Sequence, residues 1–274
     1  MTALKPNRII RICVVFLLVL ILGSAFAGWL APQPYDRVEL SDRLEGPSSK
    51  HWLGTDELGR DIWSRMLYGG RVSLLVSLVV VGLSSVIGAG LGSISGYAGG
   101  WTDEGIMRVG DLLLAFPGIL LAIGLMAVLG PGLGNVVLAL AIIGWVSFAR
   151  LSRSLTLKIR ELEFVQASRN LGASTPRILL RHVLPNVLPA LSVQLSFSFA
   201  GMILAESALS FLGLGVQPPQ PSWGNMLSEG KNHLLDAPHL TVFPGMAIFL
   251  SVLAFNLLGD ALRDQLDPRL KSIL

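Results

Sequence analysis

Charged residues are scarce in this chain. Asp, Glu, Lys and Arg make up 14% of its 274 residues, whereas a soluble domain needs about a quarter of its residues charged to cover its surface. Hydrophobic residues make up 52%, and the mean hydropathy is +0.64. The net charge of +3 is small, so we do not expect a nucleic-acid partner. The composition excludes an ordinary soluble domain and predicts a membrane protein.

Residues that build catalytic and metal sites are equally sparse. The single cysteine, Cys13, allows neither an internal disulfide nor a thiolate metal site, and we expect it to pack as a small apolar residue. The four histidines form no close ligand pair such as H-E-x-x-H, and the phosphate-binding sequence G-x-x-x-x-G-K-[ST] is missing. We therefore expect no catalytic residue, no metal site and no bound cofactor in this chain.

Long apolar runs are what the sequence has instead. A helix needs about 20 apolar residues to cross a ~30 Å hydrocarbon core, and a β-barrel would show alternating segments of about 10 residues. The first run covers residues 12–31 and follows Lys5, Arg8 and Arg11. It fits a cleavable signal peptide or an uncleaved span, and its length favours the span. Both interpretations place residue 32 outside the membrane.

The remaining runs predict five more spans. Residues 72–102 carry no charge and fit one span followed by a glycine pair that breaks the helix. Residues 112–149 would form a helix of roughly 57 Å, almost twice the membrane thickness. Because residues 130–135 have the composition of a turn, this window predicts two spans joined by a tight hairpin. Residues 183–205 and 240–259 complete the six spans.

The distribution of Lys and Arg sets the orientation. With the N-terminus inside, the inner segments hold 14 of these residues and the outer segments hold 7, which predicts two cytoplasmic termini. We divide the chain into residues 1–71, an N-terminal span with an extracytoplasmic insert, and residues 72–274, a core of five spans. Within the core, residues 150–182 are expected to form a basic cytoplasmic loop.

The extracytoplasmic insert contains a short amphipathic pattern. Leu58, Ile62 and Met66 repeat every four residues. Asp61 and Arg65 form an i,i+4 pair of opposite charge. The pattern predicts a short helix that lies on the membrane or on a partner subunit, or else a solvated surface helix.

The cytoplasmic loop carries more structure than its charge requires. Phe164, Ala167 and Leu171 fall on one helical stripe, which Gly172 ends or bends. Thr175 is expected to cap a second short helix, with Pro176 at its first position. Two short helices that meet at a glycine would form a compact basic projection. A plain loop that follows the positive-inside rule is the alternative.

Glu206 is the acid that falls within a predicted span. It lies 23 residues after the start of the fifth span, roughly 35 Å along a helix. At that distance we expect it at the outer boundary, where water satisfies it. An acid that lines a translocation path is the alternative, because intramembrane carboxylates are costly and often functional.

The cytoplasmic loop resembles a known family. Its residues at 166–168, 172 and 184–185 are similar to the EAA…G…LP loop of ABC importer permeases, although Gln166 replaces the Glu and Ser168 the second Ala. In that family the loop forms coupling helices that dock into a groove on the ATPase subunit. The resemblance assigns this role to Glu163, Gln166, Ala167, Ser168, Gly172, Leu184 and Pro185.

Three other segments narrow the resemblance. Residues 51–62, 210–215 and 256–268 are similar to segments of dipeptide, oligopeptide and nickel permeases, and the subgroup resembles the "C" permease that pairs with a homologous "B" permease. The resemblance covers nearly the whole chain. In the first segment, the residues that make up the extracytoplasmic motif of the resemblance are Gly54, Thr55, Asp56, Gly59, Arg60 and Asp61.

The resemblance implies a complete importer. The chain would be an all-α, six-span subunit with the MetI-like fold of type I importers, located in a prokaryotic plasma membrane. Its partners would be a homologous permease, two ATPase subunits that bind ATP and Mg, an external solute-binding protein and membrane lipid. This subunit would be non-catalytic. The absence of a clustered His/Cys/Met site favours di- or oligopeptides as solute, with nickel or another small solute as the alternative. A stand-alone secondary transporter is less favoured, because it would usually show inverted repeats or several intramembrane ionisable groups.

Overall fold

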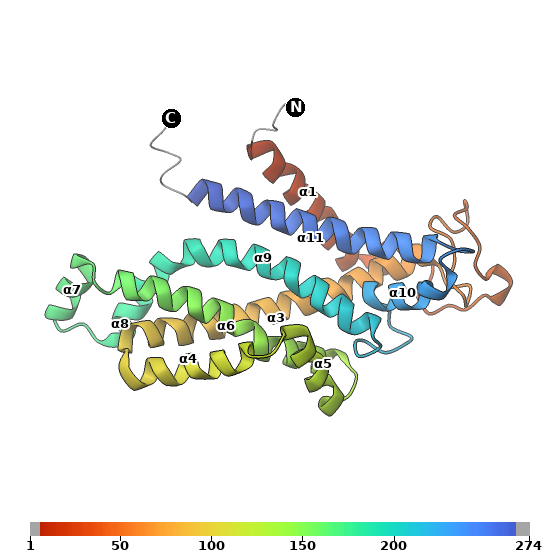
Figure 1. Cartoon of the computed structure of the whole chain (residues 1–274). Coiled ribbons are helices and arrows are strands. Elements are labelled where there is room, and N and C mark those ends of the chain that lie inside the picture. Colours follow the sequence, from red (N-terminus) through yellow and green to blue (C-terminus); the bar gives the residue numbers. More distant parts are fainter. Residues whose placement is uncertain (1–5, 267–274) are drawn as a thin grey trace.

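A computed structural model describes residues 6–266 and places the regular structure of this range in helices (Figure 1). The predicted all-α class is therefore confirmed. Asp267 and Pro268 of the C-terminal motif lie outside the described residues. The long helices are α1 (Pro6–Ala25), α3 (Ile62–Ala98), α6 (Leu133–Ile159), α9 (Leu184–Phe211) and α11 (His239–Leu266). The shorter ones are α2 (Ala27–Leu30), η1 (Leu40–Asp42), α4 (Gly100–Leu114), α5 (Gly118–Leu129), α7 (Glu163–Asn170), α8 (Thr175–Ile178), η2 (Leu179–Val183), α10 (Trp223–Gly230) and η3 (Lys231–His233).

Four helical stretches of the described range are long and apolar enough to cross a membrane. They are α3, α6, α11 and the continuous stretch Thr175–Phe211 that joins α8, η2 and α9. Helices α4 and α5 make a fifth crossing if they count as one span, although they are bent by 87°. The first apolar helix is shorter, with an apolar part at Ile10–Ala25. The exact number of six spans stays a prediction.

The region between the second and fourth predicted spans differs most from expectation. The hairpin is where the composition places it, because α5 ends at Leu129 and α6 begins at Leu133. The span before it is not straight, since the helix stops at Leu114 and resumes at Gly118. Pro117 explains the break, because proline has no N–H to donate and disfavours helical geometry in the residue before it.

The amphipathic pattern of the insert does not form a separate surface helix. Ile62 is the first residue of α3, which runs on for 37 residues, so the boundary drawn at residue 71 falls inside one helix. Ile62 and Arg65 are each 1% exposed. The face that was expected to meet membrane or solvent packs instead on Met226 of α10 and Leu240 of α11, because these helices fold over the outer end of α3.

Helices α3 and α6 approach each other along a row of glycines. Gly88, Gly92 and Gly96 recur every four residues on α3 and face α6. A Cβ at Gly88 would collide with the carbonyl oxygen of Trp145, and one at Gly92 with that of Ala149. Small residues at this spacing let two membrane helices pack backbone to backbone. The row therefore fixes the position of α6 against α3.

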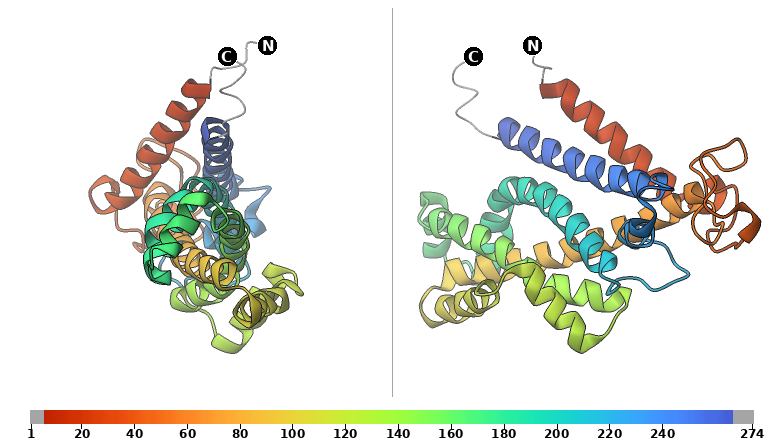
Figure 2. Two further views of the ribbon diagram at one scale, coloured as in Figure 1. Left: turned by 90° about the vertical axis from the view of Figure 1, so that its left-hand side faces the viewer. Right: turned by 45° about the vertical axis from the view of Figure 1, so that its right-hand side comes forward.

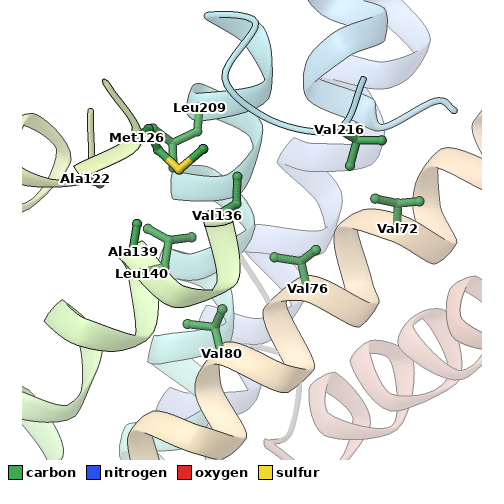
Figure 3. Packing of buried hydrophobic residues seen from close by; sticks show 10 residues of the cluster. All are labelled: Val72, Val76, Val80, Ala122, Met126, Val136, Ala139, Leu140, Leu209 and Val216. Carbon is green, nitrogen blue, oxygen red and sulfur yellow. The ribbon is translucent and has the colours of Figure 1, made fainter. Parts of the chain in front are cut away.

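Two apolar clusters fill the bundle on either side of this crossing. The first joins α3, α5, α6 and α9 through residues such as Val76, Leu140 and Leu209 (Figure 3). The second joins α3, α6 and α9 to Val165 of α7 and Ile178 of α8. Helix α7 and the segment that precedes α3 lie at opposite ends of the molecule (Figure 1).

Helix α1 lies at the periphery of the bundle (Figure 2). It packs on α11, where Cys13 and Leu17 contact Ala254. The expected packing role of Cys13 is confirmed. Figure 2 shows α1 and α11 side by side along one flank, away from α4, α5 and α6.

Candidate functional site

Helix α7 presents its apolar stripe outward. Phe164 is 45% exposed and Leu171 is 89% exposed, while Val165 is buried in the cluster that joins α7 and α8 to the bundle. The adjacent Leu162 is also exposed. Since a solvated projection gains nothing by exposing large apolar side chains, this face is suited to contact with another protein.

Gly172 closes α7 as the sequence predicts. Its φ is +81°, its N–H donates to the Arg169 carbonyl at 3.0 Å, and the Ala173 N–H donates to the Ser168 carbonyl at 3.1 Å. This is the bonding pattern of a glycine-terminated helix. A Cβ at Gly172 would have no described atom within 4 Å, so the surroundings of this glycine are open.

The second short helix of the loop differs from the prediction. Ser174, not Thr175, occupies the N-cap position, so Pro176 is the second helical residue. Helix α8 is not a separate element either, because the chain continues through η2 into α9. The π-helical turn η2 ends just before Leu184 and Pro185. Pro185 has no N–H to donate to the preceding turn, and the wider π-helical turn lets the helix continue past this missing hydrogen bond.

Gln166 connects the loop to the rest of the bundle. Its side-chain amide donates to the carbonyl oxygen of Arg160, the C-cap of α6, at 2.8 Å. The Arg160 guanidinium donates to the carbonyl oxygen of Gly96 near the end of α3, at 2.7 Å. A carboxylate at position 166 could not donate the first of these bonds. The departure from the family's glutamate therefore has a structural role in this chain.

A groove lies beside α7. Its volume is about 520 Å³, and its walls include Tyr97, Arg160, Gln166, Arg169 and Thr175. Glu163 stands in the first turn of α7, where an acid is favourable, and is exposed. The structure thus brings together most of the residues predicted for the coupling loop. Leu184 and Pro185 lie apart from them, on the first turn of α9.

The residues of the segment before α3 that match the family form a compact, largely buried unit. Asp56 accepts hydrogen bonds from the backbone and the side chain of Arg60, with Nε to Oδ2 at 2.6 Å. Thr55 and Asp61 pair as a β-bridge. Gly54 and Gly59 both have positive φ and lie against backbone atoms of residues 39–45, where side chains would not fit.

Asp61 does not pair with Arg65 as predicted. Its carboxylate caps α3 by accepting from the Ser64 N–H at 2.8 Å, and it also contacts His51 Nδ1 at 3.0 Å. Arg65 turns to Glu229 of α10 instead, at 2.7 Å. Arg60 reaches the same carboxylate oxygen at 3.0 Å. Two arginines, Asp56 and Glu229 thus form a buried cluster without net charge that ties α10 to the start of α3.

Among the described residues, one group of potential metal ligands lies in the segment before α3. Ligand atoms of Glu39, Asp42 and His51 fall within 4.8 Å of one another. The Lys50 ammonium already donates to Asp42 and lies 3.5 Å from Glu39. The hydrogen bond from Lys50 lowers the pKa of the Asp42 carboxyl to about 2. An intramolecular cation therefore balances these carboxylates.

Glu206 does not lie where water can reach it. The residue is 1% exposed and accepts a hydrogen bond from Ser210 at 2.7 Å. Its Oε2 has no hydrogen-bond partner within the described part of the chain. Because α3 and the segment before α10 cover this side of α9, the expected contact with boundary water is wrong.

Comparison with known proteins identifies the chain. Residues 88–272 match the family of binding-protein-dependent transport system inner membrane components. The chain belongs to this family. It is 50% identical over 258 residues to the glutathione transport system permease protein GsiD of Pectobacterium atrosepticum, which covers 94% of this chain and 86% of that protein. It is 45% identical over 269 residues to the dipeptide transport system permease protein DppC of Alkalihalophilus pseudofirmus, with coverage of 98% and 88%.

The solved structures confirm the fold. The chain superimposes on an inward-facing MetNI methionine ABC transporter structure with a TM-score of 0.57 at 17% identity, covering 72% of this chain and 96% of that one. The expected MetI-like fold and the expected role as an ABC importer permease are both confirmed.

Some residues that position the site were not predicted from the sequence. The sequence indicates only a positive charge at Arg160, whereas in the structure its guanidinium binds the end of α3. No local pattern indicates a role for Glu229, because its arginine partners lie more than 160 residues away in the chain. The four-residue spacing of the glycines at 88, 92 and 96 is a sequence pattern that indicates close packing of two membrane helices.

Proposed function

We propose that this permease imports di- or oligopeptides, or a peptide-like solute such as glutathione. The support is the naming of its relatives for glutathione and dipeptide transport at 45–50% identity over nearly the whole chain. Nickel is the alternative solute. No cluster of soft ligands in the sequence favours it, since cysteine occurs once and the histidines are scattered.

The mechanism we propose is alternating access driven from outside the chain. An external binding protein delivers solute to a path formed with a homologous permease, and two ATPase subunits bind ATP and Mg. Closure of the ATPases pushes on α7 from the cytoplasm, where both termini of this chain also lie. The observation that carries this proposal is the exposed apolar face of Phe164 and Leu171 beside Gly172.

Uptake by a complete transporter tests the solute. The chain would be co-expressed with its homologous permease, binding protein and ATPases in cells that lack other peptide uptake. We expect labelled dipeptide or glutathione to accumulate in an ATP-dependent manner, and unlabelled peptide to compete. Accumulation of Ni²⁺ without peptide uptake would reassign the solute.

Cross-linking tests the coupling contact. A cysteine placed at Leu171 should form a disulfide with a cysteine in the groove of the ATPase, whereas one placed at the outward-facing Leu235 (100% exposed) should not. Labelling of position 171 by an impermeant thiol reagent from outside intact cells would overturn both the topology and the coupling proposal. Separately, the purified chain alone should hydrolyse no ATP.

A further inference from the structure

An apolar groove lies on the flank of the bundle, and none of its lining residues belongs to the loop at 150–182. Its volume is about 400 Å³, and it lies where α1, α3, α9 and α11 meet. Leu74, Leu75 and Leu78 of α3 form one wall, and the stacked rings of Phe199 and Phe255, with centroids 5.0 Å apart, contribute from α9 and α11. Leu75 and Leu78 are more than half exposed. The groove therefore opens outward from the bundle.

One charged residue lines this groove. Arg71 is exposed and makes neither an ion pair nor a side-chain hydrogen bond with any residue of the described range. Arg65 and Arg60, which lie 6 and 11 residues earlier in the chain, are both buried and paired with acids. An arginine at the edge of an apolar surface extends its guanidinium toward the membrane interface, where it can bind an anion.

Aromatic residues place Arg71 at the level of the outer membrane interface. Tyr68, one helical turn before it, contacts Tyr35 with ring centroids 4.7 Å apart. Trp29 is 85% exposed and stacks on Phe26 in the segment that follows α1. Tyr and Trp concentrate at membrane–water interfaces. The guanidinium therefore lies at the depth of lipid headgroups.

The apolar wall runs from that level toward the bilayer centre. Leu78 is seven residues after Arg71, which is roughly 10 Å deeper along α3. On the opposite wall, Ser24 packs against Gly70 beside Arg71, and Ile21 lies one turn deeper on α1. A cation at the headgroup level above an apolar channel matches the shape of a phospholipid.

We propose that this groove binds a phospholipid with an anionic headgroup from the outer leaflet. Its phosphate accepts hydrogen bonds from Arg71, and one acyl chain lies against Leu75, Leu78 and the two phenylalanine rings. A headgroup with net negative charge is preferred because a zwitterionic one carries an ammonium that opposes the arginine. The bound lipid fills the space between α1 and α3 and stabilises the position of α1 on the bundle.

Native mass spectrometry of the assembled transporter tests this site. Complexes would be released from bilayers of phosphatidylglycerol and phosphatidylethanolamine in equal amounts. We expect retained phosphatidylglycerol to fall about fivefold in Arg71→Gln. It should stay unchanged in Arg43→Gln, a matched loss of an exposed outer arginine away from the groove. Leu75→Trp, which fills the groove, should also lower retention while the complex still assembles.

Three results would overturn the proposal. Equal retention in wild type and Arg71→Gln would show that the arginine does not recognise the headgroup. An equal loss in Arg71→Gln and Arg43→Gln would show a general charge effect. A disulfide between a cysteine at Leu75 and the homologous permease would show that a partner helix covers the groove. None of these readouts depends on uptake, so the proposed solute and coupling are tested separately.

Discussion

Replacement of Gly172 by aspartate separates a coupling contact from a plain loop. Within this chain the change meets no obstacle, because no described atom lies within 4 Å of a Cβ at that position. The cost comes from the φ of +81°, which a residue other than glycine adopts at roughly 1–2 kcal/mol. That is small against the ~5–15 kcal/mol that stabilises a domain. We therefore expect Gly172→Asp to insert and accumulate normally.

Gly213, which follows the C-terminal end of α9, provides a matched control. Its φ is +78°, its N–H donates to the Ser210 carbonyl, and the Leu214 N–H donates to the Leu209 carbonyl. This is the same closure as at Gly172, and it too has no described atom within 4 Å of a Cβ. Gly213→Asp introduces the same strain and charge far from α7. The difference between the two variants therefore isolates the cytoplasmic contact.

The size of the effect follows from the exposed face of α7. Burial of a large apolar side chain such as Phe164 or Leu171 contributes about 1.5–3 kcal/mol each. A charged side chain beside these residues that keeps them from docking should therefore weaken ATPase binding at least tenfold. We expect Gly172→Asp to abolish uptake and to reduce co-purification with the ATPase, or to leave ATP hydrolysis without transport. Normal uptake by Gly172→Asp would refute the coupling role of the loop.

Three further predictions concern the supports of the site. Gly92→Ala should destabilise the chain by about 1–3 kcal/mol in thermal unfolding, because its Cβ would overlap the α6 backbone. Gly90→Ala on the open face of the same helix should not, and equal effects would contradict the close crossing. Gln166→Glu should lower the amount of solute transported per ATP hydrolysed, since the lost hydrogen bond to the Arg160 carbonyl is worth about 1 kcal/mol. An unchanged ratio of transport to hydrolysis would show that this hydrogen bond does not contribute to coupling. Glu206→Ala should cost about 1–3 kcal/mol by leaving the buried Ser210 hydroxyl unpaired, whereas Glu206→Gln should keep this hydrogen bond and the stability of the chain. If Glu206→Gln stays stable but loses uptake, the carboxyl itself serves the transport path.

Turns were predictable from the sequence because their chemistry is local. The hairpin near residue 131 and the end of α7 at Gly172 both depend on glycines with positive φ. The bend at Pro117 had an equally local signal, but hydropathy alone showed one uninterrupted apolar window and concealed it. Span counting from hydropathy therefore fails where a helix breaks within apolar sequence.

Burial of polar residues was not predictable in the same way. Arg65 was assigned to Asp61 because they are one turn apart, yet its partner Glu229 comes from α10. Glu206 was placed at the boundary from its distance along the helix, but other segments cover it. Periodicity describes the faces of one helix, and the identity of what packs on each face depends on contacts distant in sequence.

Under the proposed mechanism, the contacts around α7 determine how a push on this helix would reach the rest of the bundle. The loop has two arms, since α6 precedes it and α8 leads into α9. The first arm is fixed to α3 by the glycine row and by the bond from Arg160 to Gly96, and Arg153 holds it to Asp103 of α4 at 2.6 Å. Because these links join backbones and helix ends, α3, α6 and the start of α4 should move together when α7 is displaced. The bend at Pro117 lies beyond the link to Asp103, but α5 packs on α6 through the apolar cluster that contains Met126 and Leu140, so we expect α5 to follow α6.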